Sequence, residues 1–220
     1  MDYSLRFDAI WRNFDLLLSG LGVGLLLAVA SIGVGAVIGF FVAFGLLSDN
    51  PVVSRACQLY VTILRNIPVL LVIFFVFFAM PQLGLRMDKV TSFIAALSIY
   101  SGAALAETFR GGLLAVSRGL TEAGQSIGLR PLQIKVYVVL PVMLRIVLPS
   151  LGNSFISLFK DTSLAATIAV PELTYYARKI NVESFRVIET WMITSFLYVA
   201  TTIVITTVLR LIEGRLSAQR

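Results

Sequence analysis

The sequence predicts an all-α membrane protein with about five transmembrane helices. Of its 220 residues, 58% are hydrophobic and 14% are charged, whereas soluble domains have about 45–50% apolar and about 25% charged residues. The mean hydropathy is +0.90. Several long stretches carry no charge, and roughly 20 apolar residues are enough for a helix to cross a bilayer. This composition excludes a soluble domain and a disordered chain.

The apolar stretches place the spans in order along one domain, residues 1–220. The first is charge-free from residue 16 to residue 48, longer as a helix than a bilayer of about 30 Å, so we expect it to tilt or to project. The stretch at 162–170 is too short to cross and is expected to re-enter or to be buried. We expect the spans at residues 16–47, 60–82, 90–107, 136–159 and 190–209, and a polar loop at 108–135.

Small residues recur at every fourth position in two of these spans. Such stripes let helix backbones approach closely in lipid. They indicate packing within the chain or, as an alternative, contact with a second copy; packing within the chain is the favoured interpretation. The residues are Ser31, Gly35, Gly39 and Ala43 in the first span, and Ser98, Gly102 and Ala106 in the third.

The residue inventory excludes several classes of protein. Histidine is absent and Cys57 is the single cysteine, so we expect no disulfide framework, no Cys/His metal site and no histidine-based catalytic triad. No lysine follows a glycine, as a P-loop requires, so no nucleotide is expected to bind to this chain. The net charge is +6, but the basic residues are spread singly, which argues against nucleic-acid binding.

The polar loop between the third and fourth spans has the pattern of a short amphipathic helix. Leu120, Gly124 and Ile127 fall at i, i+4 and i+7 and so share one face. Gly128 suits the end of this helix, and Pro131 suits the first turn of the next one. We therefore expect a helix–turn–helix elbow at the membrane surface. It either packs on its own bundle or docks on a partner.

The spacing within and after this elbow resembles a family signature. Glu122-Ala123-Gly124, three residues, Gly128, nine residues and Val138-Val139-Leu140-Pro141 is similar to the EAA motif of ABC importer permeases, the inner-membrane components of binding-protein-dependent transport. Gly124 stands where the motif has its second alanine, and Val138 where it has isoleucine. The polar amino acid uptake branch has similar flanking segments, namely 110–113, 148–149, 152–153, 160–164 and the Arg65-x-x-Pro68 element.

The resemblance implies a type I ABC importer permease fold and a non-enzymatic function. The EAA loop would be a coupling helix that docks on a separate ATPase, with Glu122, Ala123, Gly124, Gly128, Leu140 and Pro141 as the coupling residues. The expected partners are two ATP-binding subunits that hold ATP and Mg, a second permease (identical or homologous), an extracytoplasmic solute-binding protein and an amino acid substrate. The polar segment 171–189 is a candidate contact for the solute-binding protein; the alternative is a simple connector.

Charges within spans are costly and usually paired or functional. Arg145 lies in the fourth span. It either forms a structural ion pair with Glu107 or Glu122 and braces the loop, or lines the solute path. Its place near the cytoplasmic end favours bracing, and Glu107 is the candidate partner.

Two further elements are candidates for the solute path. Lys160, Asp161, Thr162 and Ser163 form a polar break after the fourth span, and irregular backbone at membrane depth needs cover from protein or water. The alternative is an ordinary loop at the outer surface. Arg65 with Pro68 is the second candidate; the alternative is a plain flanking charge.

Together these features predict an inner-membrane, multi-pass permease subunit that moves polar amino acids into the cell by alternating access. An odd number of spans and a slight excess of Lys and Arg on one side place the N-terminus outside and the C-terminus in the cytoplasm. The alternative function is a channel or secondary carrier for small polar solutes that needs no ATPase. Dependence of uptake on ATP distinguishes the two.

Overall fold

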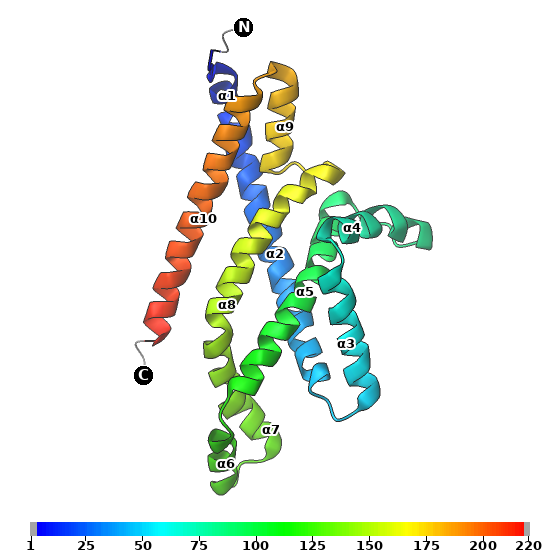
Figure 1. The fold of residues 1–220 in the computed structure, drawn as a ribbon, viewed down its shortest axis with the longest axis vertical. Helices are drawn as coiled ribbons and strands as arrows, with labels where there is room; N and C mark the ends of the chain where they lie inside the picture. The colour runs from blue at the N-terminus through cyan, green and yellow to red at the C-terminus, as the bar shows by residue number, and fades with distance from the viewer. Residues whose placement is uncertain (1–3, 218–220) are drawn as a thin grey trace.

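The computed structural model describes residues 4–217, and these residues form an elongated bundle of helices (Figure 1). α2 and α5 lie at its centre, with α8 and α10 on one side and α3 on the other. In chain order the helices are α1 Asp8–Arg12, α2 Phe14–Leu46, α3 Pro51–Asn66, α4 Val69–Phe74, η1 Phe75–Ala79, η2 Met80–Leu83, α5 Lys89–Ala115, α6 Arg118–Ser126, α7 Pro131–Gln133, η3 Ile134–Val139, α8 Leu140–Asp161, η4 Thr162–Ile168, α9 Leu173–Ser184 and α10 Val187–Ser217.

Small residues bring α2 and α5 into close contact. A Cβ added at Gly35 would lie 2.1 Å from Ser101 Oγ, and one at Gly39 would lie 2.9 Å from the backbone nitrogen of Ala106. The residues of both stripes are buried. The interpretation as packing within the chain is therefore confirmed for these two helices, because nothing larger fits where their backbones meet.

The region of the second predicted span, residues 60–82, is bent. α3 ends at Asn66, and the segment Val69–Leu83 continues at an angle of 108° to it. Pro68 stands at the break. It has no N–H for the helical ladder, and it disfavours helical geometry at the residue before it. Within the described part of the chain, four helices are long and apolar enough to cross a membrane, and the bent pair makes a possible fifth.

The apolar stretch after the fourth span is buried, as one of the two expectations for it proposed. η4 is a short 3-10 helix that follows α8 directly, and its residues Thr162, Ala165, Ala166 and Ile168 are buried. Ile168 and Val170 belong to one apolar cluster with Phe93 and Leu97 of α5. η4 is therefore buried among α2, α8 and α9, and its end adjoins α5.

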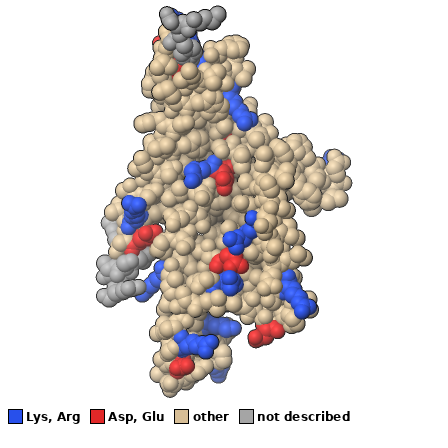
Figure 2. Space-filling model, in the orientation of Figure 1, with Lys and Arg blue, Asp and Glu red and all other residues tan. Residues whose placement is uncertain are grey.

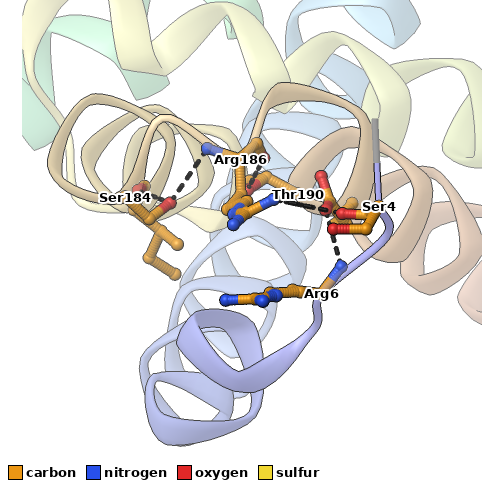
Figure 3. A network of polar contacts seen from close by, with 7 residues as sticks. Ser4, Arg6, Ser184, Arg186 and Thr190 are labelled. Atoms are coloured by element: carbon orange, nitrogen blue, oxygen red, sulfur yellow. Dashed lines mark hydrogen bonds and ion pairs between the residues drawn. The ribbon is translucent and has the colours of Figure 1, made fainter. Parts of the chain in front are cut away.

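The end of the bundle opposite α6 is tied together by polar contacts (Figure 3). Arg186 lies in the corner between α9 and α10, and its Nη1 donates to the carbonyl of Ser4 over 3.2 Å. The backbone N–H of Arg6 donates to Glu189 Oε1 over 2.8 Å, and Glu189 is fully buried. These contacts fix the beginning of the described chain on α10.

Candidate functional site

α6 has the local geometry that its sequence predicts. The Gly128 N–H donates to the carbonyl of Gln125, and the Leu129 N–H donates to that of Gly124. This pair of bonds is a Schellman motif, which needs a left-handed residue after the helix. Gly128 has φ +81°, a conformation that costs an L-residue about 1–2 kcal/mol. Pro131 then begins α7, as predicted.

The predicted apolar face of α6 is covered by the bundle only in part. Gly124 packs against Ile134 of η3, where a Cβ would lie 3.1 Å from Cγ1. However, Leu120 is 39% exposed and Ile127 is 77% exposed. The α6 backbone comes close to η3 at the glycine, which has no side chain to keep the two apart. Part of Leu120 and most of Ile127 are thus left on the surface at the extremity of the molecule.

The other predicted coupling residues lie on and beyond α6. Glu122 and Ala123 are exposed on α6 itself. Leu140 begins α8, where it packs against a cluster that includes Met143. Pro141 occupies the first turn of α8, directly after the π-helical segment η3. The exposed charges that Figure 2 shows include several at the lower end of the molecule, where α6 lies.

The predicted ion pair between Glu107 and Arg145 is wrong. Glu107 Oε2 lies 2.7 Å from Nη2 of Arg110, three residues later on the same helix, and also accepts from Arg110 Nε. Arg145 is exposed on α8. Residues three apart on a helix are neighbours. Glu107 therefore reaches Arg110 within α5, whereas a pair with Arg145 would require a contact between two helices.

A cavity of about 390 Å³ lies between α5 and α8. Asp161, the last residue of α8, contributes the one charged side chain among the residues that line it. The other polar lining residues are neutral, and Leu105 and Leu158 add apolar surface. The neutral polar residues are Tyr100, Ser101, Asn153, Ser154 and Ser157.

Of the five residues predicted for a solute path, Asp161 alone lines this cavity. Thr162 is buried, and its hydroxyl donates to the carbonyl of Phe159 over 2.7 Å. Lys160 is exposed and Ser163 is half-buried. Arg65 is exposed in the last turn of α3, so the Arg65–Pro68 element marks a helix end. The predicted group of five is therefore split by the fold.

Sequence reasoning missed the neutral half of the cavity lining. Ser154, Ser157 and Asp161 recur at i, i+3 and i+7 along α8 and so share one face. A polar stripe of this kind within an apolar span was a usable signal. The contributions of Tyr100 and Ser101 had no such signal, because they depend on how α5 packs against α8.

A buried carboxylate outside the predicted set holds the beginning of α9. Glu172 has no exposed surface and accepts hydrogen bonds from the N–H groups of Thr174 and Tyr175 and from the hydroxyl of Tyr198 on α10. Burial raises the pKa of Glu172 to about 7, although each of these hydrogen bonds lowers it. This residue joins α9 to α10 next to η4.

Residues 35–218 match the family described as binding-protein-dependent transport system inner membrane component. The glutamine transport system permease protein GlnP of Escherichia coli (strain K12) is 34% identical over 216 residues, which cover 96% of this chain and 99% of that protein. The probable glutamine ABC transporter permease protein GlnP of Bacillus subtilis (strain 168) is 40% identical over 157 residues, 69% of this chain and 71% of that protein.

Solved structures share the fold over nearly the whole chain. A chain in the crystal structure of an amino acid ABC transporter with histidines superposes with a TM-score of 0.89 at 28% identity, and it covers 97% of this chain and 100% of that one. A chain of the inward-facing MetNI methionine ABC transporter gives a TM-score of 0.79 at 21% identity, with 93% and 97% covered. The second likeness shows the fold alone.

Proposed function

The chain belongs to the binding-protein-dependent transport system inner membrane components, and from this membership we infer that it is the membrane-spanning permease subunit of an ABC importer that carries polar amino acids into the cell. The family predicted from the EAA spacing is thereby confirmed, and so is the type I permease fold. The relatives are named as glutamine and amino-acid permeases, which supports an amino acid as the solute.

The exposed face of α6 supports docking on an ATP-binding subunit. Leu120 and Ile127 present apolar surface at the extremity of the molecule, and Glu122 is exposed on the same short helix. Apolar groups in the centre of an interface with charges at its rim are typical of protein–protein contacts. In this proposal two ATPases bind and hydrolyse ATP with Mg, and this chain has no enzymatic activity of its own.

The cavity between α5 and α8 supports an amino acid as its occupant. The carboxylate of Asp161 would face the ammonium group of the solute, while the serine and asparagine side chains would donate to its carboxylate. Because the lining has one negative charge and no positive one, a solute with an acidic side chain would meet uncompensated repulsion in a low-dielectric site. Amino acids with neutral polar side chains fit this distribution.

α5 connects the two sites mechanically. Tyr100, Ser101 and Ala104 of α5 line the cavity, and the same helix ends at Ala115, close to the first residue of α6, Arg118. A displacement of α6 by the ATPases would therefore pass along one continuous helix to the cavity wall. In this proposal that movement opens the cavity alternately to the two sides of the membrane.

The remaining partners have surfaces that fit them. The segment from α4 to η2 projects sideways from the bundle (Figure 1) and exposes Leu71, Phe75 and Phe78, which suits a second permease, identical or homologous. The solute-binding protein would bind outside the cell, at the end of the bundle opposite α6, where α9 and the corner at Arg186 lie. This assignment places the N-terminus outside and the C-terminus in the cytoplasm of a multi-pass inner-membrane protein.

Reconstitution into proteoliposomes tests the proposal. Uptake should require ATP, the ATPase subunits and the binding protein together, and uptake by the chain alone would favour the secondary carrier. In the complete transporter, Asp161→Asn should raise the KM for uptake about tenfold, equivalent to about 1.4 kcal/mol. Ser163→Ala, next to the cavity but outside its lining, is the matched control and should keep the wild-type KM. An unchanged KM in Asp161→Asn would remove this cavity from the solute path.

A further inference from the structure

A long-range hydrogen bond joins the first residue of α5 to the end of η4. Lys89 Nζ donates to the carbonyl of Ala169 over 2.5 Å, across 80 residues of sequence. Between α5 and the segment 162–172, it is the one side-chain hydrogen bond that the described residues form. The neighbouring Asp88 does not compete for the ammonium group as a free carboxylate, because it accepts from Val90, Thr91 and the Thr91 hydroxyl.

The carbonyl that Lys89 binds belongs to a strained residue. Ala169 has φ 58° and ψ 33°, the left-handed conformation that a residue with a Cβ rarely adopts. It ends η4, where the last carbonyl groups lack partners within the helix and carry partial negative charge. The Lys89 ammonium group supplies both a donor and a positive charge at this point. Strain of this kind persists where the surroundings hold it in place.

The other end of η4 adjoins the solute cavity. Asp161 immediately precedes Thr162, whose hydroxyl donates to Phe159. A Cβ added at Gly24 of α2 would lie 3.2 Å from Thr162 Oγ1, so α2 closely covers this point. η4 is thus a short helix with the cavity carboxylate at its beginning and the Lys89 bond at its end.

The body of η4 packs against α2, α8 and α9. Towards α5, Ile168 and Val170 meet Phe93 and Leu97 through apolar contacts. Hydrophobic contact is non-directional, so it resists separation of η4 from α5 more strongly than sliding along it. The hydrogen bond from Lys89 adds a directional contact with α5 at the far end of η4.

We propose that Lys89 is a positioning residue for Asp161: its bond to Ala169 fixes η4 along α5 and so holds the carboxylate at the place where the solute ammonium group binds. The inference rests on the proposed function of the cavity. Without the bond, η4 moves relative to α5, and Asp161 no longer meets the ammonium group at hydrogen-bond distance. Solute affinity then falls although every residue of the cavity lining is still present.

The complete reconstituted transporter tests this proposal by the KM for uptake. Lys89→Met should raise the KM at least about threefold with the maximal rate unchanged, as expected when a binding interaction is lost. Lys89→Arg retains a donor of sufficient length and should restore the wild-type KM. Arg86→Met removes a positive charge three residues earlier in the chain, at a residue that forms no hydrogen bond or ion pair among the described residues, and should behave as wild type.

A chemical rescue keeps the test independent of how the variants fold. Lys89→Cys in a Cys57→Ser background, alkylated on the folded protein with bromoethylamine, regains an ammonium group at nearly the original length. The KM should rise in the unmodified variant and return towards the wild-type value after alkylation. Cys57 is the chain's single cysteine, so the reaction is confined to position 89.

Two results would overturn the proposal: an unchanged KM in Lys89→Met, or failure of both Lys89→Arg and alkylation to lower the KM. If the KM of Lys89→Met is unchanged while its maximal rate and thermal stability fall in proportion, Lys89 is a structural residue only. Failure of the proposed function is seen separately, as a wild-type KM in Asp161→Asn or as uptake without ATP.

Discussion

α6 and η4 are both short helices that follow a long span, and both end at a residue in the left-handed conformation, Gly128 after α6 and Ala169 after η4. Their surroundings differ. A Cβ at Gly128 would meet no atom within 4 Å, and α6 leaves Leu120 and Ile127 exposed. η4 is buried among α2, α8 and α9 and leads back to Asp161. In the proposed function, α6 contacts another protein and η4 supports the cavity within this chain.

This difference means that changes at the two helices should alter different quantities. A change in α6 should weaken coupling to the ATPases while the solute affinity and the stability of the bundle persist. A change in η4 or its supports should alter solute affinity or stability while the docking surface persists.

The replacement Gly128→Val should give the largest effect. A β-branched residue with φ +81° is a strong outlier, so the turn after α6 should change conformation although no atom is in its way. We expect ATP-driven uptake to fall at least about tenfold, with solute binding and the melting temperature of the purified permease nearly unchanged. Uptake assays with proteoliposomes measure this.

Gly111→Val is the control for that change. Gly111 lies within α5, is exposed and also has open space around it, but has no positive φ. It should transport at close to the wild-type rate. If Gly128→Val instead unfolded the bundle, or if both variants failed equally, the separation between α6 and the rest of the molecule would be wrong.

Leu120→Gln and Ile127→Gln should each have an intermediate effect. Burial of a leucine or isoleucine side chain contributes about 1.5–3 kcal/mol, and both residues have exposed surface that a partner on α6 would bury. We therefore expect the affinity for the ATPase subunit to fall about tenfold for each change, measured by co-purification at increasing dilution. Unfolding of the isolated permease should not change for Ile127→Gln, because Ile127 is 77% exposed, and should change modestly for Leu120→Gln, because Leu120 is 39% exposed.

Leu132→Gln is a useful comparison for these two, since Leu132 is 72% exposed but lies beyond α6, in α7. Wild-type affinity in Leu132→Gln would confine the docking surface to α6. Equal losses of affinity for the ATPase subunit in all three variants would show that the docking surface extends to α7 and is not a property of α6 alone.

The smallest effect concerns pH and the link between α9 and α10 that Glu172 forms next to η4. The pKa of Glu172 is raised from 4.5 to about 7 in the folded protein by burial, so the folded state holds a proton that the unfolded chain releases. The contribution of the protonated Glu172 to the stability of the fold is present below about pH 4.5 and is lost as the pH rises through about 7. The melting temperature should therefore decline over this range.

Glu172→Gln should flatten that part of the pH profile, because glutamine has no proton to release. Glu183→Gln, on the exposed face of α9 and paired over 4.0 Å with Lys179, should leave the profile as in the wild type. Thermal unfolding in detergent between pH 4.5 and pH 8 makes the comparison. A profile in Glu172→Gln as steep as in the wild type would show that another group titrates.

The local features of the fold were open to prediction from the sequence. Apolar stretches longer than a bilayer is thick can only be membrane helices, and small residues at every fourth position bring two of them together at Gly35 and Gly39. Around α6, the turn depends on Gly128 and Pro131, whose backbone restrictions act within a few residues. The family could also be predicted from the sequence, because its signature is a spacing of residues along one continuous segment.

Contacts between distant segments were decided by the tertiary structure. Glu107 pairs with Arg110 rather than with Arg145, and the five residues expected along a solute path are divided so that Asp161 alone faces the cavity. Whether Lys89 reaches Ala169 depends on where α5 and η4 come to lie. A sequence determines which side chains share a helix face, but the face that turns inward is chosen by the closest packing available among all the helices together.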